Sequence, residues 1–206
     1  MSILKDKSHT VIYNGIDTSL FVNTPSDLRE KYGIGDKFVI LGLASKWLDP
    51  INKEAFDYVL QNLPNDCAFV LFGCTENQKQ SLPENVIGLD YINDKDELRK
   101  LYSMADVMIN CSREDTLSLI NVEPQACGTP VIAYRNTGGA ETVDNACSFS
   151  VDDGDYKSLF EKIMEIKSNG KNTYSDLCRD HAVSKFDKKE NYKKYIELYE
   201  GIYRKN

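Results

Sequence analysis

Apolar residues along the chain follow two patterns. Short, nearly continuous apolar runs occupy 38–44, 68–72, 86–89, 107–109 and 131–133, with a weaker run at 148–151. Such runs are typical of parallel strands that are covered on both faces. Between them, apolar residues recur every three or four positions, which is the spacing of helices with one buried face. The chain therefore alternates between expected strands and expected helices.

Helix boundaries are indicated by Ser, Asp and Thr caps and by Gly and Pro breaks. We expect helices over 25–32, 52–63, 94–104, 119–127, 138–145, 155–168, 174–186 and 188–204, and a further short strand over 9–13. In the helix over 119–127, Pro124 leaves two alternatives: a start near Leu119 with a kink, or a regular part that starts close to Pro124. Strands alternating with helices predict an α/β fold, a three-layer Rossmann-like, doubly wound parallel sheet.

Composition narrows the class of protein. The chain has 206 residues, 41% hydrophobic and 28% charged, which suits a globular domain with a full core. Its net charge of -7 argues against non-specific nucleic-acid binding. No apolar run approaches the ~20 residues of a membrane span, and no signal-peptide region precedes the domain, so we expect a cytoplasmic protein. The six cysteines have no metal-site spacing and are expected to be buried free thiols rather than disulfides or metal ligands.

The central segment, 107–133, carries the candidate chemistry. It is expected to form a strand, an acidic loop, a helix and a second buried strand. Parallel strands joined by a helix place the helix N-terminus at the carboxyl edge of the sheet, where it attracts anionic groups such as phosphates. Asp115 and Glu123 lie close to that end in sequence. Their carboxylates are suited to accept hydrogen bonds from sugar or ribose hydroxyls.

Three ordered motifs carry a resemblance to a known family. Residues 123–131 read Glu-Pro-Gln-Ala-Cys-Gly-Thr-Pro-Val, and an acid, Asp115, stands eight places before Glu123. Residues 14–17 read Asn-Gly-Ile-Asp, and residues 138–141 read Gly-Gly-Ala-Glu. This set resembles the C-terminal, donor-binding domain of the glycosyl transferases group 1, the glycogen-synthase-like retaining glycosyltransferases of GT-B fold.

The resemblance implies an organisation and an activity. Residues 1–17 would be a hinge segment and strand from a missing N-terminal acceptor domain, 18–186 the nucleotide-sugar donor-binding domain, and 187–206 a helix that crosses back to the missing domain. That helix carries more apolar and aromatic residues than one buried stripe requires, so part of its face is expected to be exposed. The alternative is that the helix folds onto its own domain.

The implied enzyme is a hexosyltransferase type of glycosyltransferase. It would take a nucleotide-diphosphate sugar as donor, retain anomeric configuration and use no metal or other cofactor. Bacterial polysaccharide or lipopolysaccharide synthesis is a common setting for the family, and peripheral membrane association of the full-length enzyme stays open. The isolated chain, lacking an acceptor half, is expected to be inactive.

Site residues follow from the motifs. Glu123 matches the acid that contacts the nucleotide ribose, and Asp115 matches the acid that contacts the donor sugar, a role that neighbouring Glu114 is also placed to fill. The remaining donor-binding positions around the acidic loop and the glycine pair are Thr116, Leu117, Ser118, Leu119, Gly138 and Gly139.

One departure from the signature concerns charge. Pro50 and Ile51 stand where the family has an Arg-Lys pair that neutralises the diphosphate. Lys46 or Lys53 is a candidate replacement, with solvated surface lysines as the alternative. The departure supports a second hypothesis, a degenerate, non-catalytic binding module of the same fold. A third, a GT-B sugar-nucleotide epimerase, fits the signature less well.

No metal site is expected from the two Asp-x-Asp patterns. The patterns at 94–96 and 153–155 both stand at expected helix starts, where Asp is a common N-cap.

Overall fold

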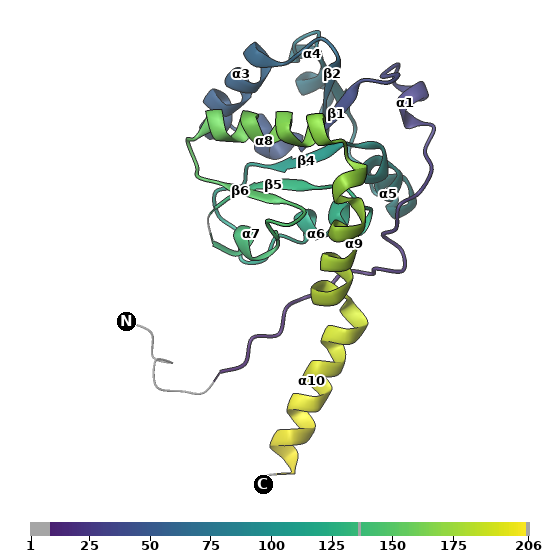
Figure 1. Cartoon of the computed structure of the whole chain (residues 1–206), viewed down its shortest axis with the longest axis vertical. Coiled ribbons are helices and arrows are strands. Elements are labelled where there is room, and N and C mark those ends of the chain that lie inside the picture. Colours follow the sequence, from purple (N-terminus) through teal and green to yellow (C-terminus); the bar gives the residue numbers. More distant parts are fainter. Residues whose placement is uncertain (1–8, 136, 205–206) are drawn as a thin grey trace.

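The computed structural model describes residues 9–135 and 137–204. It contains a six-stranded sheet in the order β3-β2-β1-β4-β5-β6, in which every pair is parallel. Figure 1 shows the sheet among its helices. The strands are β1 (Phe38–Leu43), β2 (Cys67–Phe72), β3 (Val86–Leu89), β4 (Val107–Asn110), β5 (Val131–Tyr134) and β6 (Phe149–Val151). The six strands confirm the positions that the apolar runs predict, to within one or two residues.

Helices follow most strands and cover both faces of the sheet. They are α1 (Leu28–Lys31), α2 (Ala44–Trp47), the 3-10 helix η1 (Pro50–Asn52), α3 (Lys53–Asn62), α4 (Glu76–Ser81), α5 (Lys95–Met104), α6 (Leu119–Ala126), α7 (Thr137–Glu141), α8 (Tyr156–Asn169), α9 (Asn172–Phe186) and α10 (Lys188–Tyr203). Residues from α5, α6 and α9 share one core with the sheet, while residues from α3 and α8 form the core on its other face. The three-layer, doubly wound fold is therefore confirmed.

Several local expectations differ from the structure. Residues 9–13 form no strand; the segment's first pairing is an isolated bridge between Ile16 and Asp187. A short segment with no neighbouring strand to pair with gains no ladder hydrogen bonds, so its sequence pattern alone cannot hold it extended in a sheet. The two short helices α2 and α4 were not expected. Helix α4 starts with a capping box between Thr75 and Gln78, a signal that the sequence does contain.

Helix α6 settles the two alternatives that Pro124 leaves open. It begins at Leu119 and includes Pro124 as an interior residue, close to its last turn. The carbonyl of Pro124 accepts hydrogen bonds from Cys127 and from Thr129, which turn the chain out of the helix and toward β5. The helix therefore spans the proline and ends soon after it.

A glycine near the carboxyl end of β1 allows close packing against the strand. A Cβ atom on Gly42 would lie 2.4 Å from ring atoms of Trp47. The buried indole of Trp47 thus crosses over the strand, and its Nε1 donates to the carbonyl of Ile109 in β4 at 3.3 Å. This packing fixes α2, the element that follows β1, to the neighbouring strand.

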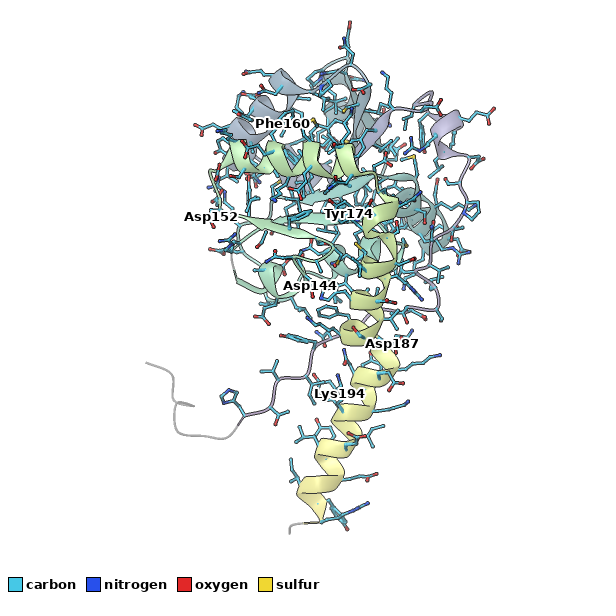
Figure 2. All side chains as sticks on the ribbon, in the orientation of Figure 1. Asp144, Asp152, Phe160, Tyr174, Asp187 and Lys194 are labelled. Atoms are coloured by element: carbon cyan, nitrogen blue, oxygen red, sulfur yellow. The ribbon has the colours of Figure 1, made fainter. Side chains whose placement is uncertain are left out.

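Helix α10 projects away from the sheet domain (Figure 1). Asp187, labelled in Figure 2 at the joint between α9 and α10, caps the helix by accepting hydrogen bonds from the amides of Lys189 and Glu190. Asn191 is the one buried residue that the helix contributes. Large exposed side chains run along it: Tyr192, Ile196, Tyr199, Ile202 and Tyr203. The expected exposed apolar face is confirmed, and the alternative of a helix folded onto its own domain is wrong.

Candidate functional site

A cleft opens at the carboxyl ends of β1 and β4. These strands are neighbours, and the strand order reverses between them, which is where doubly wound sheets bind ligands. The cleft has a volume of about 450 Å³, and its walls come from the segments that follow the two strands. It is lined by Lys46, Asp49, Ile51, Asn52, Cys111, Ser112, Arg113 and Glu114. An adjoining opening of about 450 Å³ shares Ile51 and Arg113 with it and reaches Asp153 in the loop after β6.

Another cavity, of about 170 Å³, lies at the opposite edge of the sheet. It is lined by residues that precede or begin β2 and β3, among them Cys67 and Asn85. Ligands of doubly wound sheets bind outside the carboxyl ends of the strands, so this cavity is not the candidate site.

A buried polar network holds the start of α6 in place. The side-chain amide of Asn110, the last residue of β4, donates to Ser118 Oγ at 2.9 Å and to Asn121 Oδ1 at 2.8 Å. Asn121 in turn donates to Thr142 Oγ1 at 2.9 Å. All four residues are buried, and a satisfied buried network of this kind makes the local geometry rigid. Sequence reasoning missed this network, because its members come from three separate segments: the end of β4, the start of α6 and the residue after α7.

The glycine pair allows α7 to pack tightly against the acidic loop. The amide of Gly138 donates to the carbonyl of Asp115 at 2.9 Å. A Cβ atom on Gly138 would lie 1.8 Å from the carbonyl oxygen of Thr116, so only glycine fits there. The carbonyl of Gly139 accepts from Asn121 at 3.4 Å. The predicted residues of the loop and of the glycine pair are therefore brought together.

Glu123 lies on the side of α6 that faces α5. Its Oε2 accepts a hydrogen bond of 2.9 Å from the hydroxyl of the buried Tyr102. Burial raises the pKa of Glu123, while the hydrogen bond from Tyr102 and the charge of Lys95 oppose that shift. Lys95 begins α5, a few residues after the carboxyl end of β3. Glu123 does not line the cleft between β1 and β4.

The two candidate lysines have different surroundings. Lys46, in α2, lines the cleft. Lys53 begins α3, its side chain is 70% exposed, and it forms an ion pair with Asp57 one turn further along the helix. By position, Lys46 is the better placed of the two to meet an anion in the cleft.

The remaining predicted positions lie in the loop after β4 and at the start of α6. Glu114 is exposed and lines the cleft, whereas Asp115 is half-buried in the loop next to it. Thr116 is exposed, and Leu117 and Leu119 are half-buried. The two acidic candidates thus occupy neighbouring but different environments.

Arg113 is a cation of the cleft that sequence reasoning missed. It lines both the cleft and the adjoining opening. Its guanidinium donates to the carbonyl of Ile51 at 3.0 Å and pairs with Asp153 at 3.1 Å. One signal could have identified it: Arg113 stands just after β4, the strand at which the order of the sheet reverses.

Unsatisfied buried polar atoms gather at this edge. Among the described residues, five buried side-chain polar atoms have no hydrogen-bond partner, and three of them are Asn52 Oδ1, Arg113 Nε and the Tyr134 hydroxyl. Tyr134 ends β5, and the charges of Asp153 and Arg113 act on it. Buried polar groups are normally paired, so their gathering beside an open cleft points to a place where a ligand or water supplies the partners.

Within the described residues, no group of three or more His, Cys, Asp or Glu side chains is arranged to hold a metal ion. The prediction that the reaction needs no metal stays a prediction.

All six cysteines are buried and free. No helix in the part of the chain that the structure describes is long and apolar enough to cross a membrane.

Comparison with known proteins defines the class. Residues 52–180, more than half of the chain, match the family described as glycosyl transferases group 1. The chain belongs to this family, and its sheet is the Rossmann-like domain of a GT-B fold.

One curated relative and two solved structures illustrate the similarity. The putative glycosyltransferase YtcC of Bacillus subtilis is 30% identical over 183 residues, covering 75% of this chain and 44% of its own length. Anabaena Alr3699/HepE in complex with UDP superposes with a TM-score of 0.78 at 22% identity, over 93% of this chain and 57% of that one. The C-terminal domain of a glycosyl transferase group 1 family protein (LpcC) from Francisella tularensis superposes with a TM-score of 0.63 at 20% identity, over 83% of this chain and 98% of that domain. The chain spans less than half the length of the curated relatives it matches.

Proposed function

We propose that this chain is the donor-binding domain of a glycosyltransferase and binds a nucleotide-diphosphate sugar at the carboxyl edge of its sheet. The observation that carries the proposal is the cleft at the reversal of the strand order, whose lining includes Lys46 after β1 and Arg113 after β4, in a chain of the glycosyl transferases group 1. The complex of HepE with UDP supports the same class of ligand.

Each part of the site has a role in this proposal. Glu123 accepts hydrogen bonds from the ribose hydroxyls, and Tyr102 orients its carboxylate. Asp115 or Glu114 contacts the donor sugar, within a loop that the Asn110 network and Gly138 keep rigid. Cations in the cleft stabilise the charge that develops on the departing diphosphate, which is where catalysis by electrostatic preorganisation acts. Transfer proceeds with retention of configuration and without a metal, in bacterial polysaccharide or lipopolysaccharide synthesis.

The acceptor binds to a partner domain. In this proposal the exposed face of α10 packs on that N-terminal domain, and the reaction takes place between the two. A donor domain by itself positions one reactant only, and orientation of both reactants is worth up to about 7–11 kcal/mol of barrier. We therefore expect no transfer by the chain alone.

The test is a titration of the chain with UDP and GDP, their sugar conjugates, and the corresponding nucleosides. Glu123→Gln keeps a carbonyl acceptor for Tyr102 but removes the charge, so the fold is retained. We expect nucleotide binding to weaken by about 1.5–3 kcal/mol, the scale of a hydrogen bond to a charged group. Unchanged affinity in a folded variant would contradict the role of Glu123.

An activity assay separates the enzyme from the degenerate binding module. The chain is assayed with a donor that binds and a matched acceptor, alone and together with an N-terminal partner domain supplied in trans. Transfer only in the presence of the partner supports the donor-domain proposal. Binding of a donor without transfer in either arm supports the non-catalytic module, and efficient transfer by the chain alone contradicts the two-domain argument.

A further inference from the structure

The cleft holds an arginine whose hydrogen-bonding capacity is only partly used. One guanidinium nitrogen of Arg113, Nη2, donates to the carbonyl of Ile51 and also pairs with Asp153. Its Nε is buried and has no partner among the described residues. A guanidinium has five N–H donors in a fixed planar arrangement that matches the oxygens of a phosphate. Arg113 therefore retains donors for an anion.

The surroundings of Arg113 indicate what kind of anion enters. The cleft carries a second cation, Lys46, on the segment after β1, together with the carboxylates of Asp49 and Glu114. The buried amide of Asn52 lies between the segments after β1 and β4: it donates to the carbonyls of Lys46 and Cys111, while its Oδ1 has no partner. A ligand that satisfies both kinds of group carries anionic oxygens for Arg113 and a hydroxyl for Asn52. A phosphate ester of a sugar has both.

Asp153 competes for the same guanidinium. Its carboxylate lies 3.1 Å from Arg113, and the two side chains are 35% and 31% exposed. A partly exposed ion pair contributes little to stability, so it can be exchanged for a phosphate at small cost. A phosphate beside Asp153 would also be repelled by the carboxylate, which lowers the affinity that Arg113 alone would give.

We propose that Arg113 is the cation that binds the diphosphate of the donor and that Asp153 holds its guanidinium until the donor enters. This inference rests on the proposed function. Pro50 and Ile51, which stand where the family has an Arg-Lys pair, line the adjoining opening together with Arg113. In this inference Arg113, from a different loop, supplies the positive charge that these two positions lack. Lys46 assists from the segment after β1. On binding, Arg113 exchanges Asp153 for phosphate oxygens and no covalent bond changes.

The experiment compares the affinities of nucleoside diphosphates and nucleoside monophosphates by calorimetric titration. Arg113→Gln is expected to weaken UDP or GDP binding by about 10- to 100-fold, as for loss of a charged hydrogen bond, and monophosphate binding much less. Arg113→Lys, which keeps the charge but not the planar donor set, should recover part of the loss. The matched control is Arg135→Gln: Arg135 also pairs with an aspartate after β6, Asp152, but is 61% exposed and lies outside the cleft.

Asp153→Asn tests the exchange separately and keeps the proposal testable if Arg113→Gln fails to fold. Removal of the carboxylate should strengthen diphosphate binding severalfold and leave nucleoside binding unchanged. Unchanged or weaker diphosphate binding would overturn the role of Asp153.

The outcomes distinguish this inference from the proposed function. If the unaltered chain binds neither UDP nor GDP, both are overturned. If it binds a diphosphate and Arg113→Gln behaves like Arg135→Gln, the proposed function stands and the assignment of Arg113 is overturned.

Discussion

The two edges of the sheet treat their buried polar groups differently. At the amino edge, the carbonyls of Ser103, Met104 and Ala105, at the end of α5, receive donors from distant segments: Arg29 donates to Met104, and Lys171 donates to Ser103 and Ala105. At the carboxyl edge, Asn52, Arg113 and Tyr134 keep polar atoms without partners. The other two unpaired atoms among the described residues, Arg99 Nε and His181 Nε2, lie in α5 and α9. Unpaired buried groups cost free energy, so the three at the carboxyl edge favour a role in binding there, whereas the paired carbonyls at the amino edge contribute to stability.

Removal of a charged donor at the amino edge should lower the free energy of unfolding more than any other change considered. Arg29 pairs with Asp106 at 2.7 Å, and the same carboxylate oxygen accepts from the amide of Val39, the second residue of β1. Arg29→Ala leaves Asp106 without its cation. We expect the free energy of unfolding to fall by about 2–3 kcal/mol in urea titrations, below the range for fully buried pairs because both side chains are partly exposed.

The control for this change is Arg135→Ala at the carboxyl edge, where the ion pair with Asp152 is largely exposed. Asp152, labelled in Figure 2, directly follows β6. The expected loss is within about 0.5 kcal/mol. Equal losses for the two variants would remove the distinction between the edges.

A pH dependence of stability should come from Lys171. Burial lowers the pKa of Lys171 to about 8. The unfolded chain keeps this proton up to about pH 10.4, so between pH 8 and 10.4 the unfolded state binds more protons and stability rises with pH. The neutral amine still has two N–H donors for its two carbonyls. We expect this gain to be on the order of 2 kcal/mol relative to Lys171→Met, measured by urea unfolding from pH 7.5 to 10.5.

A constant difference between the unaltered chain and Lys171→Met over that pH range would contradict this prediction. Other groups that titrate in the range cancel in the comparison, because both proteins contain them.

A smaller effect is expected at Thr129, in the Gly-Thr-Pro turn. Its hydroxyl is fully buried and donates to the carbonyl of Tyr102 at 2.7 Å, joining β5 to the end of α5. Thr129→Val keeps the shape and removes the donor, and should lower the free energy of unfolding by about 1 kcal/mol in thermal or urea denaturation. Thr116→Val, at an exposed position of the carboxyl edge, should change it by less than about 0.5 kcal/mol. A larger loss at Thr116 would reverse the comparison.

The substitution with the smallest expected effect, Tyr134→Phe, should leave the free energy of unfolding unchanged or raise it. The hydroxyl of Tyr134 is buried and has no partner among the described residues, so Tyr134→Phe removes no hydrogen bond within the protein. We expect the free energy of unfolding to rise by up to about 1 kcal/mol. Tyr102→Phe is the matched variant: the two tyrosines are equally buried, but the hydroxyl of Tyr102 is paired with Glu123, so its removal should destabilise the chain. A loss at Tyr134 equal to that at Tyr102 would show that the Tyr134 hydroxyl has a partner.

The sequence alone determined the parallel sheet and its order of elements. Apolar runs such as 38–43 and 107–110 and the helical spacing between them are local properties, and the handedness of strand-helix-strand units leaves few topologies. The acidic loop, Glu123 and the Gly-Thr-Pro turn were identified because they stand in one segment that resembles the signature of the glycosyl transferases group 1. The exposed face of α10 was also readable, because it carries more apolar residues than one contact stripe needs.

Only the tertiary structure decided which polar groups share a site. Arg113 meets Ile51 across 62 positions of sequence, and Asn52 meets Cys111 across 59. Asn121 joins Asn110 to Thr142 through contacts among separate elements. The spacing of apolar residues along the sequence does not indicate such pairs, because hydrogen bonds between distant segments depend on how strands and helices pack. For the same reason Lys46 lines the cleft, whereas Lys53 pairs with Asp57 in its own helix, although the two lysines are only seven positions apart in sequence.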